Sequence, residues 1–158
     1  MEDLIAQAQA PDGFAHVNLG NGFASHVGPL FMKAEDPVPI IGFRVLEHHC
    51  NPADICHGGM MMTVMDMAIG MGAASKVQTA QFTPSVNLTY DFMRPAPKGI
   101  WLQSRIDFAE GRKRIAFAHG YLDGPDGPVI RCNGITKIPS AGSTQFKIRD
   151  GEPWGEHG

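Results

Sequence analysis

The sequence has few charged residues, few cysteines and no long uninterrupted apolar run. Charged residues make up 18% of the 158-residue chain and the net charge is -3, which gives no general reason to expect nucleic acid as a partner. Three cysteines, an odd number, argue against a disulfide framework and favour a reducing compartment. The first ten residues carry no Lys or Arg, which a secretory signal peptide would need. We therefore expect a cytoplasmic protein.

The most apolar stretch is CHGGMMMTVMDMAIGMGAA, residues 56–74. It is short for a membrane span and is interrupted by Asp66 and four glycines, so it predicts a buried helix over 58–74 and no membrane partner. Six of the nine methionines lie within 60–71, where they fill the core or line an adaptable pocket. A helix that is apolar on every side must be enclosed by the rest of the fold.

Alternating apolar and polar residues predict strands on both sides of this helix. The predicted strands are 28–33, 39–49, 85–92, 100–108, 114–122 and 128–138. Short Gly/Pro turns between the later ones indicate antiparallel neighbours. The pattern predicts an α+β fold, with an antiparallel sheet of five to six strands wrapped around one long central helix. A helix over 2–10 and an irregular arm to residue 28 precede the main domain, 29–138, and a polar tail, 139–158, follows it.

Asp66 is the only charged residue of the predicted helix. A buried carboxylate without a partner is costly, so it either pairs with a cation such as Arg94 or Arg105, or it belongs to a functional site. Gly58 opens the same helix, where free N–H groups can stabilise a developing oxyanion or simply allow tight packing. Asn51, just upstream, can hold a water molecule or cap a turn.

Gly58 and Asp66 are eight residues apart, which separates them by about 12 Å on one straight helix. No single carbonyl group can contact both. A site that uses both residues therefore requires two chains, with the site at their interface.

The motif N-x5-HGG-x6-D, formed by Asn51, His57, Gly58, Gly59 and Asp66, is followed by NLTYDFMRPAPKG at 87–99. The pair resembles hotdog-fold acyl-CoA thioesterases of the phenylacetate-degradation type, over roughly residues 38–138. The resemblance implies a homodimer, paired further as a dimer of dimers, that hydrolyses an acyl-CoA or aryl-acyl-CoA thioester. It implies no cofactor beyond the coenzyme A of the substrate.

The resemblance also implies roles for individual residues. Asp66 would be the general base or the nucleophile, and the Gly58 N–H would polarise the thioester carbonyl. Asn51 would orient the attacking water, and His57 would lie near the thioester sulfur or brace its loop. Thr83, four residues before Asn87, would hold the water beside Asp66, with Ser85 as the alternative.

Coenzyme A would require cations for its phosphates. The candidates are two residues after one strand and three in a predicted turn: Arg94, Lys98, Arg112, Lys113 and Arg114. Such residues are also common as solvated surface charges.

A metal site is the competing interpretation of five residues before the helix: His48, His49, Cys50, Cys56 and His57. The cysteine spacing does not fit a structural zinc site, and we expect no metal. A nucleophilic Cys56–His57 pair is also disfavoured, because sequence neighbours seldom have the required geometry.

Two other functions fit the same architecture. The first is an acyl-CoA binding or sensor module without catalysis, which would have no need of Asp66. The second is a hydratase or dehydratase of acyl thioesters, which the resemblance connects with a histidine on the central helix. That helix has no histidine beyond His57 at its start.

Overall fold

The computed structural model of the protein describes residues 1–20, 22–79 and 82–140. Its helices and strands follow one another in the order α1 (Glu2–Ala8), β1 (Ala15–His16), α2 (Phe23–Val27), β2 (Phe31–Lys33), β3 (Ile40–Arg44), the 3-10 helix η1 (Glu47–His49), α3 (Gly58–Lys76), β4 (Ser85–Phe92), β5 (Trp101–Arg112), β6 (Ile115–Gly124) and β7 (Gly127–Lys137). None of the described helices is long and apolar enough to cross a membrane.

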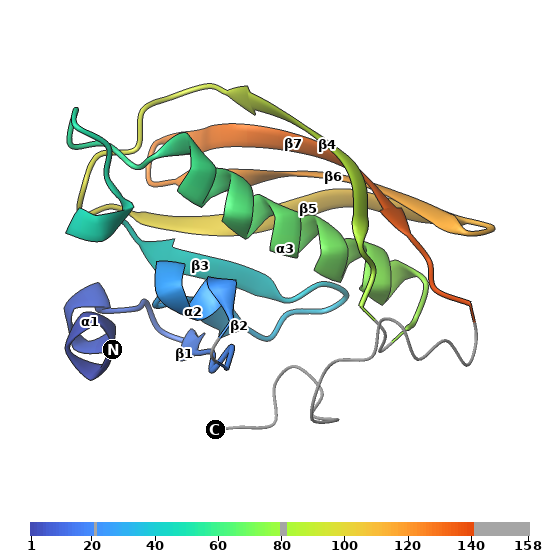
Figure 1. Cartoon of the computed structure of the whole chain (residues 1–158), viewed down its shortest axis with the longest axis horizontal. Coiled ribbons are helices and arrows are strands. Elements are labelled where there is room, and N and C mark those ends of the chain that lie inside the picture. The colour runs from blue at the N-terminus through green and yellow to red at the C-terminus, as the bar shows by residue number, and fades with distance from the viewer. Residues whose placement is uncertain (21, 80–81, 141–158) are drawn as a thin grey trace.

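The strands form one antiparallel sheet around a long helix, as the sequence predicts. Their order is β1-β2-β3-β5-β6-β7-β4, which places β4 at one edge. Helix α3 runs along one face of this sheet, with the long strands β5, β6 and β7 behind it (Figure 1). The sheet has seven strands rather than five to six, because residues 15–16 add a short strand, β1, next to β2.

Helix α3 is held by burial along most of its length. Its fully enclosed side chains include Val64, Met65 and Ile69, which belong to one core cluster with residues of β3, β5, β6 and β7. The helix lies close to β7, since a Cβ on Gly134 would come within 2.4 Å of the Ile69 side chain. Met60, Met61 and Met65 are buried in this core, whereas Met67 and Met71 are only partly buried. The position of α3 relative to the sheet is tightly fixed.

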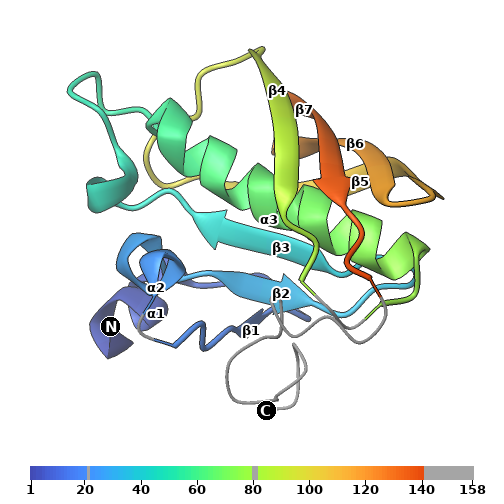
Figure 2. The same cartoon turned by 45° about the vertical axis from the view of Figure 1, so that its right-hand side comes forward.

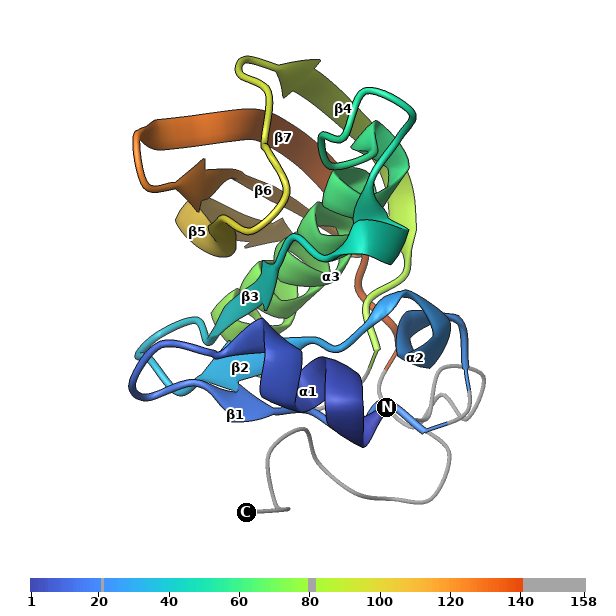
Figure 3. The ribbon, with the colours of Figure 1, turned by 90° about the vertical axis from the view of Figure 1, so that its left-hand side faces the viewer.

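The segment 14–28, predicted to be irregular, contains β1 and α2, and this prediction was wrong in that respect. Strand β2 lies between β1 and β3, on the opposite side of the sheet from β4 (Figure 2). Helix α1 lies beside the β1–β2 end, where the N-terminus is also found (Figure 3). The Arg44 guanidinium fixes the end of α1 by donating to the carbonyl oxygens of Ala8 and Gln9, both at 2.8 Å.

The predicted strand over 39–49 ends at Arg44, and both histidines that were expected to finish it lie in η1. Burial and, to a smaller extent, the adjacent His48 together lower the pKa of His49 to about 4. The His49 ring contacts the Val27 carbonyl oxygen at 2.9 Å. His49 thus ties the connection before α3 to the end of α2. Across the described ranges 1–20, 22–79 and 82–140, no three His, Cys, Asp or Glu side chains are grouped closely enough to hold a metal ion.

Candidate active site

The beginning of α3 presents a free backbone donor. The Nδ1 atom of His57 caps the helix by accepting the Gly59 N–H at 2.9 Å, while the Met60 N–H bonds to the His57 carbonyl oxygen. In the described part of the chain, the Gly58 N–H has no acceptor. A Cβ on Gly58 would lie 3.1 Å from the Phe92 ring, so the missing side chain lets β4 pack closely against this helix end.

The loop before α3 is held by short-range contacts. The Asn51 side-chain oxygen accepts the Ala53 N–H at 2.9 Å, which is the turn-capping geometry. Lys98 bridges two carboxylates, Glu47 at 2.6 Å and Asp54 at 3.0 Å. These contacts connect the loop that carries Asn51 and His57 to the segment between β4 and β5.

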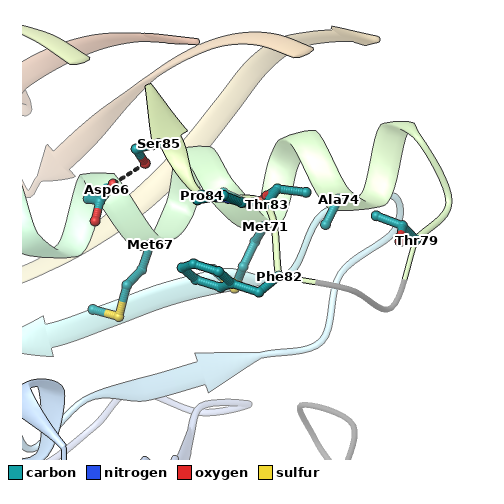
Figure 4. A pocket seen from close by; sticks show the side chains of 10 residues that line it. Asp66, Met67, Met71, Ala74, Thr79, Phe82, Thr83, Pro84 and Ser85 are labelled. Atoms are coloured by element: carbon teal, nitrogen blue, oxygen red, sulfur yellow. Dashed lines mark hydrogen bonds between the residues drawn. The ribbon is translucent and has the colours of Figure 1, made fainter. Parts of the chain in front are cut away.

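Asp66 lies two turns further along α3 and is half-buried. The Ser85 hydroxyl, at the start of β4, donates to its Oδ1 atom at 2.5 Å (Figure 4). Among the described residues Asp66 has no ion-pair partner. Arg94 instead donates to the Pro128 carbonyl oxygen at 2.7 Å. The carboxylate is therefore held by a neutral hydroxyl and not by a cation of the described structure.

Arg105, the other possible ion-pair partner of Asp66, is paired with carboxylates of the sheet. Arg105 pairs with Asp123 at 2.7 Å and with Asp107 on the neighbouring positions of β5 and β6. Its guanidinium also lies 4.7 Å from the centre of the Tyr121 ring.

Thr83 does not occupy the position beside Asp66. Its hydroxyl donates to the Gly70 carbonyl oxygen at 2.9 Å, and its side chain is buried against α3 one turn further along. Ser85 contacts the acid instead. The pairing of β4 with β7 shifts between Ser85 and Asn87, and this irregularity changes which side chain faces Asp66.

Tyr90 and Cys132 lie on the sheet side of Asp66. Burial raises the pKa of the Cys132 thiol to about 12, and the charge of Asp66 adds to this effect. Burial also raises the pKa of Tyr90, whose hydroxyl donates to the Met62 carbonyl oxygen at 3.3 Å. Both groups therefore stay neutral at physiological pH.

A cavity of about 230 Å³ begins at Asp66 and extends along the second half of α3. It is lined by five residues of the helix and five after it: Asp66, Met67, Gly70, Met71, Ala74, Thr79, Phe82, Thr83, Pro84 and Ser85. Figure 4 shows Met67, Met71 and Phe82 on the same side of α3. The sequence analysis missed Ala74 and Phe82, although Gly70 and Ala74 follow Asp66 at the four-residue spacing of one helix face.

The predicted coenzyme A cations fall into two groups at opposite ends of the sheet. Arg94 and Lys98 precede β5, whereas Arg112, Lys113 and Arg114 surround the turn after it. Twelve residues of β5 separate the groups by about 36 Å, so a single phosphate group cannot contact both within one chain.

Most of these cations have acceptors of their own. Arg112 pairs with Glu110 at 2.8 Å, and Arg114 donates to the Ser140 hydroxyl at 3.1 Å. Lys98 pairs with Glu47 and Asp54.

This arrangement of sheet, helix and edge strand recurs in solved proteins. The phenylacetic acid degradation protein PaaI of E. coli, 16% identical, aligns with a TM-score of 0.64 over 76% of this chain and 86% of its own. A mutant of PaaI from Thermus thermophilus, also 16% identical, gives a TM-score of 0.63 over 74% of this chain and 98% of its own. Zebra fish thioesterase superfamily member 2, which is 20% identical, aligns with a TM-score of 0.66 over 77% of this chain and 89% of its own.

Sequence comparison points the same way. Residues 53–119 match the family model described as "Thioesterase superfamily". The chain has the hotdog fold of these solved structures. A Pseudomonas aeruginosa protein named "Putative esterase PA0474" is 27% identical over 130 residues, which is 82% of this chain and 97% of that protein. The hotdog fold accounts for the enclosed helix, and the matched segment includes Gly58, Asp66 and Ser85.

Proposed function

We propose that the protein is an acyl-CoA thioesterase that works as a homodimer, with Asp66 as the general base. The main observation behind this proposal is the environment of Asp66. Its carboxylate has no cation partner in the described structure and accepts a hydrogen bond from Ser85 at the mouth of an apolar cavity. A carboxylate placed in this way can accept a proton from water next to a bound acyl group. The match of residues 53–119 to the thioesterase superfamily supports a hydrolase.

The proposed reaction adds one water molecule across the C–S bond. Asp66 takes a proton from water while the water oxygen bonds to the thioester carbon. The carbonyl oxygen becomes an oxyanion that accepts a hydrogen bond from the Gly58 N–H of a second copy. The C–S bond then breaks, and the coenzyme A thiolate leaves and takes up the proton held by Asp66. The acyl group departs as a carboxylate after its hydroxyl proton passes to solvent.

The remaining residues of the site have supporting roles in this proposal. Ser85, and not Thr83, orients Asp66 and the water, because its hydroxyl reaches the carboxylate. His57 shapes the helix start that presents Gly58, and Asn51 orients the water through its amide. A nucleophilic role for Asp66 would require the carboxylate itself to bond to the thioester carbon.

A second copy is required because Gly58 and Asp66 of one chain are separated by about 12 Å along α3. Strand β4 supports such a pairing, since it is an edge strand that carries exposed apolar side chains, with Val86 63% and Phe92 53% exposed. Unpaired strand edges with apolar residues readily pair with another chain. We further propose that two dimers associate, as in the resemblance described above.

Coenzyme A would be bound by cations at the rim of this dimer. Lys113 is the most available of these cations for a phosphate group. It lies in the turn after β5 and forms no ion pair within residues 1–20, 22–79 and 82–140. Arg94, Lys98, Arg112 and Arg114 would each have to give up or share an existing acceptor.

The test is release of free thiol from a panel of acyl-CoA thioesters by the purified protein. Asp66→Asn keeps the shape of the side chain and removes the base, so hydrolysis should fall by about 10²- to 10⁴-fold. Asp12→Asn, in an exposed turn between α1 and β1, is the matched control and should hydrolyse at the normal rate. Circular dichroism should show equal folding of all three proteins.

Two results would contradict the proposal. Full activity of Asp66→Asn would remove the general base from the mechanism. A folded dimer that binds acyl-CoA and releases no thiol from any thioester would indicate the binding module instead.

A further inference from the structure

The cavity at Asp66 has a defined direction. Asp66, Gly70 and Ala74 follow one another at four-residue intervals, so they lie on one face of α3 and form the floor of the cavity. The eight residues from Asp66 to Ala74 span about 12 Å. The carboxylate lies at one end of this floor, and Thr79 and Phe82 line the other region of the cavity beyond Ala74.

The cavity walls are apolar beyond its mouth. Met67, Met71 and Phe82 supply large apolar side chains, and the Thr83 hydroxyl is already bonded to the Gly70 carbonyl oxygen at 2.9 Å. Among the described lining residues, Asp66 is the only ionisable one. A charged group at the far end of a ligand would therefore lie beside apolar side chains without a counter-charge among these residues, which is unfavourable.

The size of the cavity limits what it can hold. Its volume is about 230 Å³. A methylene group occupies roughly the volume of a water molecule, about 30 Å³. The cavity can therefore hold about eight carbons. An extended chain advances roughly 1.2 Å per bond, so a floor of about 12 Å spans about ten bonds, and the volume is the tighter limit.

Resting on the proposed thioesterase function, we propose that this cavity binds the acyl group and that it selects neutral acyl groups of about six to eight carbons. Gly70 and Ala74 set the length, because any side-chain atom added at either position enters the cavity. Gly70 has room for a methyl group, since the nearest atom to its added Cβ is the Thr83 Oγ1 at 3.7 Å.

The test is a series of straight-chain acyl-CoA thioesters from acetyl to palmitoyl. The value of kcat/KM should rise about fourfold per added methylene, up to about eight carbons, and then fall. Gly70→Ala and Ala74→Leu should each lower kcat/KM for octanoyl-CoA about tenfold or more, and should lower kcat/KM for butanoyl-CoA by a much smaller factor. Ala6→Leu, on the exposed side of α1, is the matched control for added volume and should reproduce the original profile.

A charged chain end tests the polarity of the cavity. Adipyl-CoA has the chain length of hexanoyl-CoA with a terminal carboxylate, and its kcat/KM should be at least about a hundredfold lower. Phenylacetyl-CoA has a similar volume to octanoyl-CoA and separates a requirement for volume from a requirement for a straight chain.

Binding to the Asp66→Asn variant tests the cavity independently of catalysis. Calorimetric Kd values for the same thioester series should show the same optimum and the same shortening by Ala74→Leu. A flat series, an optimum at acetyl or palmitoyl, or a profile unchanged by both cavity variants would overturn this inference while leaving the thioesterase proposal intact. Absence of turnover by the unaltered protein, together with a length-dependent Kd, would overturn the thioesterase proposal and retain the cavity assignment.

Discussion

The Ser85 hydroxyl provides a sharp test of how Asp66 is positioned. Ser85→Ala removes a hydrogen bond of 2.5 Å to the carboxylate and leaves the backbone of β4 in place. A hydrogen bond to a charged group contributes about 1.5–3 kcal/mol. Ser85 is exposed, so water replaces part of this contribution, and the lower value of about 1.5 kcal/mol applies.

A loss of about 1.5 kcal/mol corresponds to about a tenfold decrease in kcat/KM. The assay measures thiol release with octanoyl-CoA as the only substrate. Urea unfolding of Ser85→Ala and of the unaltered protein is measured alongside it. The free energy of unfolding should change by less than about 0.5 kcal/mol, because an exposed side chain contributes little to stability. Ser85→Thr restores a hydroxyl and should recover most of the activity.

Thr83→Val is the matched comparison. It removes the buried hydroxyl that bonds to Gly70 at 2.9 Å, so it should lower the free energy of unfolding by about 1–3 kcal/mol and affect kcat/KM less than Ser85→Ala does. The reasoning is refuted if Ser85→Ala keeps full activity while a folded Thr83→Val loses it. The water would then be held by Thr83, as the family resemblance first implied.

Three further predictions concern the fold and the assembly. Gly134→Ala should destabilise the protein by about 1–3 kcal/mol in urea unfolding, because its Cβ would lie 2.4 Å from Ile69; an unchanged midpoint would contradict the tight packing of α3 on β7. His49 has a native pKa of about 4 against 6.5 in the unfolded chain, so the unfolded state binds the extra proton and stability falls by up to about 3 kcal/mol as the pH drops from 6.5 to 4; His49→Gln should flatten this part of the pH dependence, and an equally steep fall in the variant would assign it to other groups. Val86→Arg should convert the dimer to monomers in light scattering and reduce thiol release in parallel, and a fully active dimer would place the interface elsewhere.

The parts of the fold with a regular hydrophobic pattern could be predicted from the sequence. The helix over 58–74 was predicted from its apolar character and its Gly58-Gly59 start, and the structure extends it to Lys76. Strand β4 was predicted over 85–92 and has those bounds. Residues 15–16 and 23–27 were missed, because elements of two and five residues are too short to show a period.

The candidate site could be predicted only in part. Asp66 stands out because a buried charge in an apolar helix is costly without a partner, and Gly58 stands out because it opens this helix, where backbone N–H groups are free. The contact between Ser85 and Asp66 depends on the irregular pairing of β4 after Ser85, and alternation alone cannot place such a shift. The separation of Arg94 from Arg112 depends on the direction of β5, which a list of basic residues does not contain.

Strand β4 contributes Ser85 to the pocket and forms one edge of the sheet, so the proposal gives one segment a part in both chemistry and assembly. Under the proposed mechanism, each chain completes the other's catalytic centre. Diluting the protein below the dissociation constant of the pair would then lower turnover per chain, without any inhibitor and without unfolding. The abundance of the protein in its cell would thereby set its specific activity as well as its total activity.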